Sequence, residues 1–162
     1  MLAKTKLLLL VAALGLATDQ FAKAIARTAL PLCRIPSPTC EGLHLGSDVG
    51  LVRVANGGSA LGFGQGLGVW VVIAAIGALI VPAYARSRSD PRLAVAAGLQ
   101  LGGAVGNMAD RLLLGGVTDF IQVSHLVLNV ADLALVAGTV MAAGLLWIVR
   151  PEPSLGEIEA TN

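Results

Sequence analysis

Four apolar stretches, each close to 20 residues long, restrict the folds open to this chain. They cover residues 7–25, 67–85, 93–114 and 127–149. An α-helix needs about 20 mainly apolar residues to cross a bilayer, because every backbone polar group must find its hydrogen-bond partner within the segment. We therefore expect an all-α membrane protein with four transmembrane helices.

The composition agrees with a membrane location. Hydrophobic residues other than glycine make up 56% of the chain and charged residues 13%, whereas a soluble domain is about 45–50% apolar with glycine included and about 25% charged. A net charge of +1 provides no basic surface for nucleic acid, and two cysteines are too few for a thiolate zinc site. We expect no nucleic-acid partner, no metal and no other cofactor.

Basic residues indicate the orientation of the chain. They lie beside alternate ends of the apolar stretches, at Lys4, Lys6, Arg86, Arg88, Arg92 and Arg150. By the positive-inside rule both termini are cytoplasmic, so that residues 1–150 form one membrane domain and residues 151–162 a short cytoplasmic tail. A cleaved signal peptide is the alternative interpretation of the first stretch. Asp19, Gln20 and Lys23 argue against it, because a cleavage region favours small residues.

The segment 27–66 is the expected extracytoplasmic loop. Its runs 43–45 and 51–54 alternate between apolar and other residues, a pattern typical of strands, and we expect a small β-rich region at the membrane surface. Cys33 and Cys40 would lie there in an oxidising compartment. The sequence leaves open whether they form a disulfide or remain free thiols.

Polar side chains gather toward the outer ends of the expected helices. Each charge costs about 2.5–3.5 kcal/mol at the centre of a membrane helix, so such a cluster indicates a site. Asp19 and Lys23 are four residues apart and can form an ion pair that holds the bundle together. Asp119 and Asp132 have no cation at helical spacing, which favours a functional role. The cluster contains Asp19, Lys23, Asn107, Asp110, Arg111, Asp119, Asn129 and Asp132.

Two carboxyl groups that meet in a poorly hydrated site share one proton near neutral pH, because repulsion and desolvation oppose the ionisation of both. The ionised group then accepts a proton from an attacking water. The protonated group hydrogen-bonds the carbonyl oxygen and later protonates the leaving amine. Asp119 and Asp132 therefore indicate the chemistry of an aspartic peptidase.

Two other classes of protein compete with this interpretation. A small transporter would use the ionisable residues as a relay, which requires such groups through the whole depth of the membrane. The inner halves of the four stretches hold no acidic residue. A non-catalytic assembly factor would use the polar cluster only to hold its helices together, and it would tolerate the substitution Asp119→Asn.

Five motifs resemble those of the bacterial lipoprotein signal peptidase family, also called signal peptidase II. In chain order they are DQFAK at 19–23, NGGSA at 56–60, GGAVGNMADR at 102–111, VTDF at 117–120 and NVAD at 129–132. The resemblance implies a four-helix aspartic endopeptidase of the bacterial inner membrane with its active site near the outer face. Such an enzyme cuts diacylglyceryl-modified prolipoproteins before the lipidated cysteine.

The resemblance also implies a role for each matched residue. Asp119 and Asp132 would form the catalytic pair. The substrate-binding residues would be Asn56, Asn107, Arg111 and Asn129, and the supporting residues Asp19, Lys23 and Asp110. Prolipoproteins and membrane lipid are the implied partners, and the cyclic peptide globomycin is the implied inhibitor.

The chain departs from the family at three places. Leu61 and Leu128 stand where the family usually has phenylalanine, and the stretch between Asp119 and Asp132 is short. Because these two phenylalanine rings are replaced by leucine, we expect the pocket to differ in shape from that of other members and to bind globomycin with a different affinity. The pair of aspartates itself is unaffected.

Overall fold

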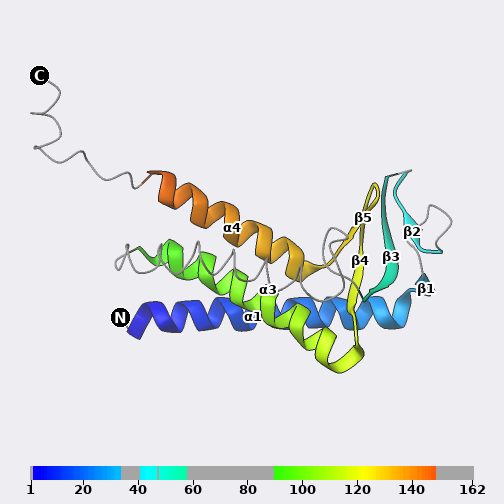
Figure 1. The fold of residues 1–162 in the computed structure, drawn as a ribbon, viewed down its shortest axis with the longest axis horizontal. Helices are drawn as coiled ribbons and strands as arrows, with labels where there is room; N and C mark the ends of the chain where they lie inside the picture. Colours follow the sequence, from blue (N-terminus) through cyan, green and yellow to red (C-terminus); the bar gives the residue numbers. More distant parts are fainter. Residues whose placement is uncertain (1, 34–40, 47, 58–89, 149–162) are drawn as a thin grey trace, which may run out of the picture.

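The computed structural model describes residues 2–33, 41–46, 48–57 and 90–148. Within these ranges the helices α1 (Leu2–Ala29), α3 (Pro91–Leu114) and α4 (Val130–Ile148) pack together, and a sheet lies at one end of them (Figure 1). The strands of this sheet are β1 (Leu32–Cys33), β2 (Leu43–His44), β3 (Val49–Asn56), β4 (Val117–Val123) and β5 (Leu126–Leu128).

The expectation of an all-α protein with four transmembrane helices is wrong. A mixed sheet of five strands forms a substantial part of the described fold. Among the described helices, α1 alone is long and apolar enough to cross a membrane. The last apolar stretch begins with β5, so that α4 provides only a shorter apolar helix, Val130–Leu145. The expected helix at 67–85 lies outside the described residues.

The sheet confirms the two strands expected near residues 43 and 51. β2 pairs antiparallel with β3, with Leu43 opposite Leu51. β3 pairs antiparallel with β4, and β4 with β5, while β1 lies parallel to β3. Cys33 on β1 is disulfide-bonded, whereas the other cysteine, Cys40, lies outside the described residues.

A β-hairpin, formed by β4 and β5, links α3 to α4. β4 contains Val117, Phe120 and Ile121, but its first four residues are all buried. Alternation between buried and exposed positions is the usual sign of a strand, and burial on both faces removes it. This hairpin carries Asp119 between the two helices.

An irregularity in β3 lies beside Asp119. Leu51 is opposite Ile121 and Val54 is opposite Asp119, so that a longer segment of β3 faces a shorter one of β4. Such a β-bulge bends the strand and changes the direction of nearby side chains, and bulges are common next to active sites. The bulge therefore helps to set the direction in which the Asp119 side chain projects from the sheet.

Glycines bring α3 close to both of the other described helices. A Cβ atom at Gly102 would lie 2.6 Å from the carbonyl oxygen of Ala12 on α1, and one at Gly103 would lie 2.6 Å from that of Ala131 on α4. Small residues allow this close approach of backbones in membrane proteins. α3 is thus the central helix against which the other two are placed.

Gly102→Ala is expected to destabilise the fold, since the new methyl group would meet backbone and not a movable side chain. Overpacking of this kind costs about 1–3 kcal/mol. Gly144→Ala is the matched control, because nothing lies within 4 Å of its added Cβ. Thermal unfolding in one detergent should show a lower midpoint for Gly102→Ala and an unchanged or higher midpoint for Gly144→Ala. Equal midpoints for the two variants would contradict the close packing.

Candidate active site

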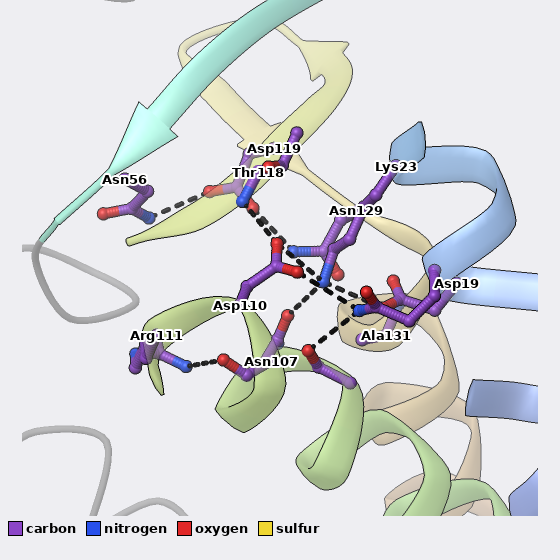
Figure 2. Close-up of polar contacts among 12 residues, drawn as sticks. Asp19, Lys23, Asn56, Asn107, Asp110, Arg111, Thr118, Asp119, Asn129 and Ala131 are labelled. Atoms are coloured by element: carbon purple, nitrogen blue, oxygen red, sulfur yellow. Dashed lines mark hydrogen bonds and ion pairs between the residues drawn. The ribbon is translucent and has the colours of Figure 1, made fainter. Parts of the chain in front are cut away.

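The polar cluster lies where the helices meet the sheet (Figure 2). Asp119 is in the middle of β4 and only 3% exposed. Asp132 is in the first turn of α4 and is half-buried. Asn129 lies between the hairpin and α4 and is fully buried. The hairpin thus brings the two aspartates, 13 residues apart in the sequence, to a common residue.

Asn129 contacts both aspartates. Its Nδ2 donates to Oδ1 of Asp119 at 2.6 Å, and its backbone N–H donates to Oδ2 of Asp132 at 3.1 Å. In return, the backbone N–H of Asp132 donates to Oδ1 of Asn129 at 2.9 Å. The reciprocal bonds between Asn129 and Asp132 form a capping box, which begins α4. One asparagine therefore starts the helix and links the two carboxylates.

Two further asparagines donate to the remaining carboxylate oxygens. Nδ2 of Asn56, at the end of β3, donates to Oδ2 of Asp119 at 2.9 Å. Nδ2 of Asn107, on α3, donates to Oδ1 of Asp132 at 2.8 Å. Each of the four carboxylate oxygens thus accepts one N–H. A carboxylate oxygen has two lone pairs, so each retains capacity for a proton or a water.

The electrostatics of Asp119 suit acid–base chemistry. Its pKa is raised to about 6, first because burial disfavours the charged form and also because the Asp132 carboxylate is near. The hydrogen bonds from Asn56 and Asn129 favour the charged form and partly oppose this rise. Asp119 therefore changes its protonation state close to neutral pH.

The expected Asp19–Lys23 ion pair is present and fully buried, with Lys23 Nζ 2.8 Å from Oδ2 of Asp19. Lys23 also lies 3.6 Å from Oδ2 of Asp110 and donates to Oδ1 of Asn107 at 2.9 Å. Oδ1 of Asp19 accepts the backbone N–H of Ala131 at 2.8 Å. α1 thereby contacts both α3 and the first turn of α4 through polar groups (Figure 2).

Asp110 connects α3 to the strand that carries Asp119. Its Oδ2 accepts the backbone N–H of Thr118 at 2.9 Å, and its Oδ1 lies 3.5 Å from the Arg27 guanidinium. Arg27 also donates to Oγ1 of Thr118 at 3.1 Å. Sequence reasoning missed Arg27, although it follows Asp19 and Lys23 at the same four-residue spacing. That spacing places all three on one face of α1.

Gln20 is a second residue that sequence reasoning did not assign. Its Nε2 lies within hydrogen-bond distance of Oδ2 of Asp19, the carbonyl oxygen of Gly106 and Oδ1 of Asp110. Gln20 belongs to the matched motif at 19–23, which is the signal that could have drawn attention to it.

Arg111 is placed differently from the other expected site residues. Its guanidinium donates to the carbonyl oxygen of Asn107, one turn earlier on α3, at 3.1 Å. Within the described part of the chain, no hydrogen bond joins it to either aspartate.

The two leucines that replace the family's phenylalanines can be placed only in part. Leu128 is half-buried on β5, and Leu61 lies outside the described residues.

One buried and one half-buried carboxyl group, held by N–H donors and linked through Asn129, can activate a water by acid–base catalysis. In the ranges that the structure describes, no group of three or more His, Cys, Asp and Glu side chains could hold a metal ion. With the apolar α1, the fold and this site define a membrane peptidase of the aspartic type.

The chain matches the model of the signal peptidase (SPase) II family over residues 11–148 and belongs to this family. The predicted family and the predicted protease class are thereby confirmed. Cleavage of lipoprotein signal peptides is the activity that this family and the names of its members indicate.

Several curated relatives bear the name lipoprotein signal peptidase. The protein of Moorella thermoacetica is 38% identical over 140 residues, which cover 82% of this chain and 87% of that protein. The protein of Rhodococcus jostii is 32% identical, with 91% and 75% covered. The match to the Streptomyces coelicolor protein, 36% identical, covers 60% of this chain and spans about half of that protein, 52%.

A solved structure, a bacterial membrane enzyme determined by the in meso method at 2.3 Å resolution, has a similar fold. It superposes with a TM-score of 0.66, covering 90% of this chain and 93% of that one, at 22% sequence identity. At this identity the likeness concerns the fold alone. The family and the apolar α1 agree with a membrane protein.

Proposed function

We propose that this chain is an aspartic endopeptidase that removes the signal peptide of diacylglyceryl-modified prolipoproteins, cutting before the lipidated cysteine. The observation that carries the proposal is the hydrogen-bonded connection from Asp119 through Asn129 to Asp132. Family membership and the names of the relatives support the class of substrate. We assign the catalytic roles to Asp119 and Asp132.

In this reaction the two aspartates share one proton. The ionised carboxylate takes a proton from water as the water oxygen bonds to the peptide carbonyl carbon, and the protonated carboxyl hydrogen-bonds the carbonyl oxygen. The carbon–nitrogen bond then breaks, and the amine of the modified cysteine leaves with a proton from the pair. The asparagine donors keep both carboxylates in place throughout.

The neighbouring amide and guanidinium groups are suited to hold the extended substrate backbone. Asn107 and Asn129 each give one side-chain N–H to an aspartate, and we assign the second N–H of each amide to the substrate. The guanidinium of Arg111 donates one hydrogen bond to a carbonyl oxygen of α3 and has further N–H groups that can donate to a substrate carbonyl. Asn56 would complete the groove from the end of β3.

We place the enzyme in the bacterial inner membrane with the site near the outer face. The bonded state of Cys33, on β1 of the same sheet, supports an oxidising compartment on that side. Lys4 and Lys6 lie near the beginning of α1 and Arg92 near the beginning of α3, far along both helices from the site, which agrees with a cytoplasmic location of that end. The acyl chains of the substrate would remain in membrane lipid, and globomycin is the expected inhibitor.

The proposed function is tested with a synthetic precursor peptide that carries a diacylglyceryl cysteine, and with the same peptide carrying an unmodified cysteine. The purified full-length protein should cut only the lipidated peptide, immediately before the modified residue, as mass spectrometry of the products will show. Globomycin should block this cleavage. A folded protein that leaves the lipidated peptide intact would contradict the proposal.

The raised pKa of Asp119 predicts a pH dependence. The form of the pair that holds one proton is the active one, and it is depleted as pH rises through the pKa of about 6. We therefore expect kcat/KM to fall on the alkaline side, by about tenfold per pH unit once the pair is fully ionised. Initial rates from pH 5 to 9 measure this fall of kcat/KM. A kcat/KM that does not change with pH would contradict a proton shared by the two aspartates.

A further inference from the structure

The last turn of α1 contacts the strands β3 and β4 through a residue to which the family resemblance gives no role. We propose that Arg27 is a positioning residue for Asp119 and that it acts through the hydroxyl group of Thr118, the residue directly before this aspartate. This role rests on the proposed function, since it concerns the placement of a catalytic aspartate by an arginine that does not contact the substrate.

The Arg27 guanidinium lies between α3 and β4. Its Nη1 donates to Oγ1 of Thr118 at 3.1 Å and lies 3.5 Å from Oδ1 of Asp110. Thr118 is buried, whereas the Arg27 side chain is 25% exposed. Asp110 also has Lys23 at 3.6 Å, so that its carboxylate keeps a cation when Arg27 is replaced. The bond to Thr118 is therefore the contact for which Arg27 is specifically required.

Thr118 is held from two directions. Its backbone N–H donates to Asp110 on α3, and its hydroxyl oxygen accepts from Arg27 on α1. Successive side chains of a strand point to opposite faces, so the Asp119 carboxylate projects from β4 on the face opposite to the Thr118 hydroxyl. A rotation of β4 about its own axis would move both groups together. Holding Thr118 in place therefore fixes the direction of Asp119.

The backbone of Arg27 is itself attached to β3. Nη1 of Arg53 donates to the carbonyl oxygen of Arg27 at 2.9 Å. This carbonyl has no intrahelical partner, because the residue four positions later is Pro31, which has no N–H. Arg53 lies in the bulge of β3, directly before Val54, which pairs with Asp119. The end of α1 thus contacts the residue before Asp119 and the residue before its cross-strand partner.

A displaced Asp119 would differ in ionisation as well as in position. Its two asparagine donors favour the charged form, so weakening their bonds raises the pKa of Asp119 above its value of about 6. Replacing Thr118 by a neutral residue changes no charge, and a shift of the pH profile in such a variant therefore reports the position of the carboxylate. Charged side chains near Asp119 or the residues beside it belong to Lys23 and Arg27 on α1, Arg53 on β3, Asp110 on α3 and Asp132 on α4.

A double-mutant cycle tests whether Arg27 acts through Thr118. Thr118→Val keeps the branched shape and removes the hydroxyl, whereas Thr118→Ser keeps the hydroxyl. Each is made alone and together with Arg27→Gln. Thr28→Val and Arg92→Gln are the matched controls, because the Thr28 hydroxyl bonds to carbonyl oxygens of its own helix and Arg92 pairs with Asp90 at the other end of the bundle.

The measurements are kcat and KM for the lipidated peptide, per folded protein and from pH 5 to 9, with the thermal midpoint in detergent as the folding control. We expect Thr118→Val and Arg27→Gln each to lower kcat by about tenfold, because slight misplacement of a catalytic group is costly. KM should stay within about twofold, since the binding contacts are retained. In Thr118→Val the fall of kcat/KM should move to higher pH by about half a unit.

The combined variants identify the path. In the Thr118→Val background, Arg27→Gln should lower kcat by less than about threefold, because both changes remove the same bond. In the Thr118→Ser background it should still cost about tenfold. Thr118→Ser by itself and the two controls should remain within about threefold of the wild-type kcat.

Equal losses from Arg27→Gln in the wild-type and Thr118→Val backgrounds would overturn the inference, as would an unchanged pH profile in Thr118→Val. Should Arg27→Gln fail to fold, the comparison of Thr118→Ser with Thr118→Val decides, and equal kcat values for these two variants reject the role of the hydroxyl. A wild type that fails to cut contradicts the proposed function and with it this role. Additive losses in an active enzyme contradict this inference alone.

Discussion

Asp119→Asn is expected to abolish cleavage, lowering kcat by at least about a thousandfold, which corresponds to about 4 kcal/mol of activation free energy. The amide has nearly the shape of the carboxylate but takes up no proton from water. In addition, one side of the new amide would place N–H groups against the donors of Asn56 or Asn129. Asp132→Asn should be as harmful. Single-turnover cleavage of the lipidated peptide measures both losses.

Asp90→Asn is the matched control for these substitutions. Asp90 accepts hydrogen bonds from Arg92 at the beginning of α3, where asparagine caps a helix equally well. Its kcat should equal that of the wild type. Substantial residual cleavage by Asp119→Asn would exclude the aspartic mechanism. Membrane extraction and thermal unfolding establish that each variant is present and folded.

The second large effect is expected at Asn129. Asn129→Ala removes the donor to Asp119 and the side-chain acceptor at the beginning of α4. We expect kcat to fall by at least about a hundredfold, the range found when one preorganised hydrogen-bond donor is removed. The free energy of unfolding should fall by about 1 kcal/mol through the lost helix cap. Kinetics and thermal unfolding on the same preparation measure the two losses.

Asn129→Ser separates the two roles of this residue. Serine caps helices about as well as asparagine, but its side chain is shorter and brings no N–H to Asp119. The thermal midpoint should therefore stay near that of the wild type while kcat remains low. A Ser variant with full activity would show that the bond from Asn129 to Asp119 is dispensable.

Local rules were sufficient for part of the site. The Asp19–Lys23 pair follows from a spacing of four residues on a helix, and the antiparallel pairing of residues 43 and 51 follows from alternation. Both depend on neighbours in the sequence. The bonds from Lys23 to Asn107 and from Asn129 to Asp119 instead depend on how separate elements pack. Spacing along the chain contains no information about those distances.

The fold class was wrong for a related reason. Hydropathy counts apolar residues without separating a buried strand from a helix, and so residues 127–128 of β5 were added to the helix that follows. β4 is buried on both faces and lacks alternation, which concealed the hairpin altogether. The sheet forms by pairing between residues that are far apart in the sequence, such as Val54 and Asp119.

The capping box at Asn129 and Asp132 has a consequence for how this enzyme fails on heating. Fraying concentrates at helix ends, and it requires far less energy than separating packed helices. Here the hydrogen bonds that begin α4 also hold Asp132, one of the two aspartates of the proposed catalytic pair. We therefore expect activity to be lost on heating before the helices separate, through the opening of this first turn of α4.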